Sequence, residues 1–380
     1  MNNSRIAAFL WFLSVIAFVI AALQRAATQH ELQLGALIFS TIVFALLMGF
    51  YLMFSNTQMA EILPQFTRNG GEYGLPGFLF LLYVILVLIA RLTNPVVAIV
   101  VAGATLWVPV GLWSRNEEAL TPVQAVAGLA VLLIPLGADL VLGARPDAAG
   151  IALRLGAFAL PALLILLTTR EQKSRLNFYF ASAVLFIWYS VEFGTVPEVG
   201  LPAGVSLIGY MKLALIVLLL YVVTLSGRLP EAGFTFALTR HDWWEVAINF
   251  VLFAIIAIPI GLMTGFLKPS AALPSLWEVF SRGLAIFLFV ALPEELLFRG
   301  VIHRYLERVL RWSPLATLIL SSVIFGAAHL NNPPNVGYYF ILATVAGIFY
   351  GRTFLRTGKV VPAAIVHLLV DGAWSIFFAG

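Results

Sequence analysis

The stretch ALPEELLFRG, residues 291–300, places two neighbouring carboxylates and one arginine in a strongly apolar part of the chain. Two later apolar segments also carry titratable residues: FGAAH ends at His329, and HLLVD begins at His367 and ends at Asp371. Charged or titratable side chains at bilayer depth are costly, so each is a candidate functional residue. Carboxylates and imidazoles together supply acids, bases and ligands, a combination that favours hydrolysis over transport.

The composition indicates an integral membrane protein. Of 380 residues, 61% are hydrophobic and only 11% are charged, whereas soluble domains carry about 25% charged residues. The absence of cysteine excludes disulfides, thiolate nucleophiles and cysteine-based metal sites. A spanning helix needs about 20 apolar residues, which predicts an all-α polytopic transmembrane bundle of about 13 helices (range about 11–14). The candidate segments are centred near residues 14, 44, 82, 104, 132, 159, 186, 215, 254, 289, 322, 344 and 370.

Basic residues indicate how the chain is oriented. Lys and Arg residues gather on alternate loops, and the two most basic of these are segments 299–311 and 352–359. The positive-inside rule then places the N-terminus in the cytoplasm. We expect a bacterial plasma-membrane protein whose partners are the bilayer and a membrane-associated protein or peptide, and not nucleic acid.

The two glutamates have different neighbours. Glu295 and Arg299 are four residues apart, so on a helix they share a face and can form an ion pair. Glu294 points about 100° away from that face, which leaves it for chemistry. The alternative is an interfacial cluster of Glu and Arg at a helix end.

The histidines also follow helical spacing. His367 and Asp371 share one helix face, where a carboxylate would orient the imidazole ring. His329 follows small residues that allow a close helix approach. The alternatives are a structural hydrogen-bonding role for His329 and a packed polar pair for His367 and Asp371.

These motifs resemble those of the CPBP family of intramembrane endopeptidases, also called the Abi or CAAX-protease family. EExxxR corresponds to residues 294–299, FxxxH to 325–329 and HxxxN/D to 367–371. The resemblance covers about residues 243–378. It implies a catalytic core over residues 241–380, preceded by an N-terminal multi-helix region, residues 1–240, of unknown role.

The resemblance also implies roles for these residues. Glu294 would activate water for attack on a peptide bond, and His329 would hold or polarise that water. His367 and Asp371 would stabilise the oxyanion. Glu295, Arg299 and Phe325 would support them. The substrate would be a membrane-associated protein or peptide, prenylated or signal-like.

Position 371 departs from the pattern of prenyl-protein endopeptidases, which often carry Asn there. Asp371 can donate a hydrogen bond only when protonated; when ionised, it would orient His367 or bind a cation. Glu294, His329, His367 and Asp371 then offer an all-N/O ligand set for zinc. We expect a metal-independent glutamate mechanism without a cofactor, with a zinc mechanism as the alternative.

One geometric problem accompanies this hypothesis. In an upright helix, His329 would lie about 25 Å from the basic segment that follows Glu294, at about 1.5 Å per residue. The hypothesis therefore needs tilted or offset helices, and we expect one long helix over residues 284–310.

Two other classes of function use the same residues. A proton-coupled transporter could employ the carboxylates and histidines as a relay, although no clear repeat between the two halves supports it. A non-catalytic scaffold of the same fold would act through binding alone.

Overall fold

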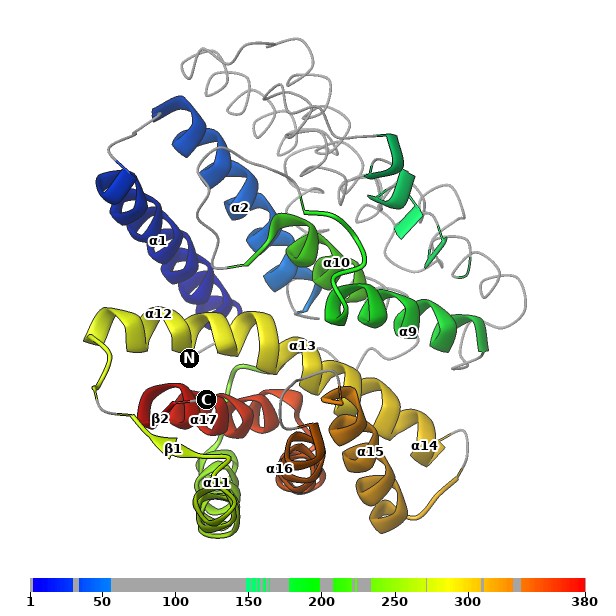
Figure 1. Ribbon diagram of the computed structural model, residues 1–380. Helices are drawn as coiled ribbons and strands as arrows, with labels where there is room; N and C mark the ends of the chain where they lie inside the picture. The colour runs from blue at the N-terminus through cyan, green and yellow to red at the C-terminus, as the bar shows by residue number, and fades with distance from the viewer. Residues whose placement is uncertain are drawn as a thin grey trace. The chain divides into compact units, whose positions relative to one another are not determined.

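The computed structural model describes residues 3–29, 34–55, scattered positions between 148 and 164, 178–198, 208–220, 223, 234–270, 272–308, 311–330 and 336–379 (Figure 1). The chain forms two compact units, Met1–Pro230 and Glu231–Gly380. The boundary predicted from the sequence lies at residues 240–241 and stays a prediction. The roles assigned to the two parts stay predictions.

The described helices of the first unit are α1 (Asn3–Gln29), α2 (Leu34–Phe54), α9 (Phe178–Glu192) and α10 (Tyr210–Leu220). Helices α1 and α2 pack together through the stacked rings of Phe18 and Phe44, whose centroids are 4.5 Å apart. The indole N–H of Trp11 donates to the carbonyl of Ala45 at 2.8 Å. The predicted segments near residues 82, 104 and 132 lie outside the described residues, as does most of the one near 159.

The second unit contains α11 (Arg240–Met263), α12 (Leu276–Ile286), the π-helical segment η4 (Phe287–Ala291), α13 (Leu292–Glu295), a second π-helical segment η5 (Leu296–His303), α14 (Arg304–Arg308), α15 (Pro314–Ala328), α16 (Val336–Thr357) and α17 (Val360–Phe377). Two short strands, β1 (Lys268–Pro269) and β2 (Phe378–Ala379), pair antiparallel. Among the described residues, four helices are long and apolar enough to cross a membrane: α1, α11, α16 and α17. The all-α membrane fold is therefore confirmed.

The segments from α12 to α14 form one uninterrupted helical run, residues 276–308 (Figure 1). Pro293 lacks an N–H and its ring crowds the carbonyl four residues earlier. A wider π-type turn precedes it, in which Leu292 donates its N–H to the Phe287 carbonyl. Widened turns of this kind often accompany functional sites. The expected long helix is confirmed through Arg308, and residues 309–310 lie outside the described part.

Helices α15 and α16 approach each other closely because glycines line their contact. A Cβ added to Gly347 would lie 3.1 Å from the Ser322 Cα, and one added to Gly326 would lie 2.7 Å from the Phe340 carbonyl oxygen. The residue pairs 322 with 347 and 326 with 340 show that the helices run antiparallel. This register fixes which part of α16 faces the FGAAH segment.

Helix α11 is fastened to the α16–α17 hairpin by ion pairs at its N-terminal end. Lys359 Nζ lies 2.7 Å from Asp242 Oδ2, and Arg356 Nε lies 3.2 Å from Glu245 Oε1. Beyond the other end of α11, β1 pairs with β2, which directly follows α17. Both attachments hold α11 as one wall of the space beside the titratable residues.

Candidate active site

The predicted ion pair of Glu295 and Arg299 is present and fully buried. Arg299 Nε lies 2.9 Å from Glu295 Oε2, and both side chains have 0% exposure. Arg299 also donates from Nη2 to the Gly347 carbonyl at 3.0 Å. Its guanidinium carbon lies 5.5 Å from the centre of the Phe325 ring. Arg299 thus joins the long helical run to α15 and α16 at one point.

Glu295 has a second partner that the sequence did not reveal. Its Oε1 lies 3.1 Å from His367 Nδ1. A carboxylate between a guanidinium and an imidazole compensates the cost of burying all three polar groups. Glu295 therefore connects the EExxxR segment to α17.

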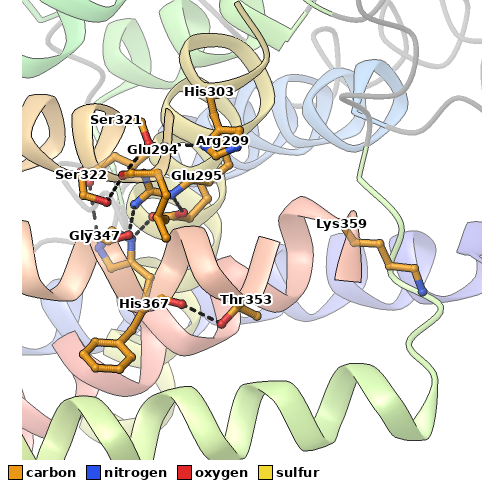
Figure 2. A network of polar contacts seen from close by, with 12 residues as sticks. Glu294, Glu295, Arg299, His303, Ser321, Ser322, Gly347, Thr353, Lys359 and His367 are labelled. Atoms are coloured by element: carbon orange, nitrogen blue, oxygen red, sulfur yellow. Dashed lines mark hydrogen bonds and ion pairs between the residues drawn. The ribbon is translucent and has the colours of Figure 1, made fainter. Parts of the chain in front are cut away.

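The other ring nitrogen of His367 faces the remaining carboxylates. His367 Nε2 lies 3.3 Å from Asp371 Oδ2 and 3.9 Å from Glu294 Oε2. Glu294 and Asp371 are partly exposed, at 20% and 33% of their side chains, whereas His367 is buried. Figure 2 shows Glu294, Glu295 and Arg299 grouped near Gly347. The structure brings Glu294, His367 and Asp371 together, and their catalytic roles stay predictions.

His329 joins this group through an aromatic ring. It ends α15, and its Nδ1 lies 2.9 Å from the Phe325 carbonyl oxygen. The Phe325 ring is centred 4.8 Å from the His329 ring and 5.7 Å from the His367 ring. The distance of about 25 Å expected between His329 and the basic segment of an upright bundle therefore does not separate His329 from the site, because the rings of His329 and His367 both lie against Phe325.

A cavity of about 650 Å³ opens beside these residues. His329, His367 and Asp371 line it together with Tyr339 and Tyr350. Most of the remaining wall is apolar and comes from α11, α16 and α17, as with Phe253, Ala257, Leu342, Ala346, Val370 and Trp374. Glu294 reaches this group through its contact with His367 and is not part of the cavity wall.

Sequence reasoning missed two residues of α16. Gly347 supplies the carbonyl that accepts from Arg299, and the Tyr350 ring stacks on His367 with centroids 4.7 Å apart. The only sequence signal was the spacing Gly347-x-x-x-Gly351, a small-residue pattern typical of close helix packing in membranes. That pattern does not show which helix is contacted.

The described residues offer no ready metal centre. No group of three or more His, Cys, Asp or Glu side chains among them is arranged to hold a metal ion. The zinc ligand set considered from the sequence, Glu294, His329, His367 and Asp371, does not fit that purpose in this arrangement. We therefore derive no step through a metal, and metal independence stays a prediction.

The fold and this polar group define a helical membrane protein in which one carboxylate and two imidazoles line an apolar cavity, with Glu294 beside them. Residues 274–373 match the family model described as Type II CAAX prenyl endopeptidase Rce1-like. This match includes all three motifs and confirms the resemblance to the CPBP family. No curated protein and no solved structure matches the chain. The family match supports a CAAX-type intramembrane protease of the CPBP type.

Proposed function

We propose that this protein is an intramembrane endopeptidase that hydrolyses a peptide bond of a membrane-associated protein or peptide, with Glu294 activating the attacking water. The observation that carries the proposal is the contact between Glu294 and His367, 3.9 Å apart, beside the apolar cavity. Both residues lie within the segment that matches the family.

The two adjacent glutamates support different tasks. Glu295 is committed to Arg299 and His367 and has no exposed side-chain surface. Glu294 retains 20% side-chain exposure, although its Oε2 atom, which faces His367, is buried. A general base must lie within reach of the water it deprotonates, and such a base contributes about 10²- to 10⁴-fold to the rate. Of the two glutamates only Glu294 has exposed side-chain surface, so we assign this role to Glu294.

His367, Asp371 and His329 assist the reaction in this proposal. Attack on a carbonyl needs donors where the oxyanion develops. His367 presents Nε2 toward Glu294 and lines the cavity. Asp371, 3.3 Å from Nε2, orients the ring. His329 lines the cavity beside Phe325 and positions the water or the carbonyl.

The cavity indicates the chemistry of the substrate near the scissile bond. Apart from the titratable residues and the two tyrosines, its lining is almost entirely apolar. Uncharged, apolar residues or substituents can enter such a space without losing hydration of a charge. A prenylated or signal-like substrate satisfies this condition, and its identity is part of the proposal.

A cell-wide comparison of membrane-associated peptide termini tests the proposal. Cells carrying the wild type, Glu294→Gln or Glu307→Gln are compared at equal expression. Glu307 is an exposed residue of the same helical run and serves as the matched control. We expect new termini that depend on the wild type and on Glu307→Gln, and that disappear with Glu294→Gln.

The same cells distinguish the alternative functions. Termini that are identical in all three strains contradict cleavage that depends on Glu294. Proton-coupled uptake without a peptide product would indicate a transporter. If the cellular function of the protein persists in both the Glu294→Gln and the His329→Ala variants, the protein acts as a non-catalytic scaffold.

A further inference from the structure

Tyr350 lies against one face of the His367 imidazole. The two rings are nearly parallel, with an interplanar angle of 14° and centroids 4.7 Å apart. Tyr350 is 1% exposed, so neighbouring helices confine its ring. Phe325 meets both rings almost at right angles, at 5.7 Å from each. His367 is therefore enclosed by two aromatic rings as well as by carboxylates.

The carboxylates and the tyrosine restrain different motions of the imidazole. Glu295 at Nδ1 and Asp371 at Nε2 act in the plane of the ring. These two contacts define the orientation of the ring plane less well, because the χ2 angle of histidine has a broad range of allowed values. A parallel ring on one face limits tilting about the line between the two nitrogens. Tyr350 supplies that restraint.

Tyr350 itself is held at a rigid helix contact. Gly347 and Gly351 on either side of it let α16 lie close to α15: a Cβ at Gly351 would be 2.5 Å from Leu318 Cδ1. The Gly347 carbonyl also accepts the hydrogen bond from Arg299. The ring of Tyr350 is thus fixed relative to both α15 and the long helical run.

We propose that Tyr350 is a positioning residue, whose ring holds the plane of the His367 imidazole so that Nε2 is directed at Glu294 and the cavity. The ring, and not the hydroxyl, carries this role. The proposal rests on the proposed peptidase function for its effect on rate, but its structural content is independent of any activity.

Histidine-selective NMR tests the structural content without a substrate. The chain has five histidines, so isotope-labelled rings give few signals, and His367→Gln assigns the signal of interest. A ring stacked face to face shifts the His367 carbon-bound protons upfield. We expect this shift in the wild type and in Tyr350→Phe, and its loss in Tyr350→Leu. Tyr338→Leu is the control, because Tyr338 is 41% exposed on the same helix and lies outside the cavity wall.

Kinetics tests the effect on the reaction. The probe is a peptide spanning a cleavage site found by the comparison of termini, with protein reconstituted in liposomes. We expect the kcat of Tyr350→Phe to remain within about threefold of the wild-type value. Tyr350→Leu should lose about 10²-fold in kcat with little change in KM, because misplacing a catalytic group by about 1 Å has an effect of this size. Tyr350→Met replaces Tyr350→Leu if the latter does not fold.

The outcomes separate this inference from the proposed function. An unchanged His367 shift in folded Tyr350→Leu or Tyr350→Met shows that the two rings do not stack, and so removes the contact on which the positioning role rests, whatever the activity. Equal loss of kcat in Tyr350→Phe and Tyr350→Leu also overturns it, because the hydroxyl would then be the active group. Cleavage by Glu294→Gln at the wild-type rate overturns the proposed function and leaves the NMR result standing.

Discussion

Replacement of Arg299 by methionine should destabilise the protein severely. The change removes the arginine partner of the Glu295 carboxylate, which has 0% exposure and keeps only its contact with His367 Nδ1 at 3.1 Å. It also removes the hydrogen bond to the Gly347 carbonyl. The carboxylate must then take up a proton or stay charged at high cost. Removing one partner of a buried ion pair costs about 3–5 kcal/mol.

The expected loss is large enough to measure by thermal unfolding in detergent. For a unit of this size, about 1 kcal/mol corresponds to about 2–4 °C, so Arg299→Met should lower Tm by roughly 6–20 °C. The chain provides a matched control in Arg282→Met. Arg282 and Glu278 have the same spacing of four residues, 3.6 Å apart, but their side chains are 51% and 48% exposed. An exposed pair contributes about 0–1 kcal/mol, so this control should shift Tm little.

The double variant Glu295→Met/Arg299→Met completes the test. Replacing both charged partners by apolar residues avoids the buried unpaired carboxylate and costs in addition only the contact of His367 Nδ1 with Glu295, so the double variant should be more stable than Arg299→Met alone. Equal Tm values for Arg299→Met and Arg282→Met would refute the reasoning. So would a double variant less stable than Arg299→Met.

Three further predictions follow from other parts of the chain. Gly326→Ala should lower the free energy of unfolding by about 1–3 kcal/mol, because its Cβ would collide with Thr344 and the Phe340 carbonyl. The control Gly372→Ala should be neutral or stabilising, because a Cβ there meets nothing within 4 Å. Equal melting curves for the two variants would contradict this packing. The chain has no cysteine, so single cysteines can be introduced at Arg5 and at Glu307. Both should react only with a membrane-impermeant thiol reagent applied from the cytoplasmic side. Reaction with the same reagent applied from the other side would contradict the predicted orientation. Chelation with EDTA or 1,10-phenanthroline should leave cleavage by the purified protein unchanged, and an activity lost to chelators and restored by zinc would establish a metal mechanism instead.

Local features of this site could be predicted from the sequence because they depend only on helical spacing. Glu295 with Arg299, and His367 with Asp371, are each four residues apart and do meet, at 2.9 and 3.3 Å. The long helix through Glu294 was also expected. These features need no knowledge of how helices pack against one another.

Contacts between distant segments could not be predicted in the same way. The approach of Glu295 to His367, and the stacking of Tyr350 on that ring, depend on the register of α16 and α17 against the long helical run. The register of α15 against α16 is set by glycines such as Gly347, whose role appears only once the opposite helix is known. The distance problem for His329 had the same origin, since the sequence does not show that Phe325 contacts both histidines.

The most direct test of the central claim is cleavage by the purified protein in liposomes, using a peptide that spans a site found in cells. Glu294→Gln keeps the shape of the side chain and removes its basicity. With folding verified by Tm, we expect Glu294→Gln to lower kcat by about 10²- to 10⁴-fold, the contribution of a general base, while Glu307→Gln retains the wild-type rate. Cleavage by Glu294→Gln at the wild-type rate would contradict the account.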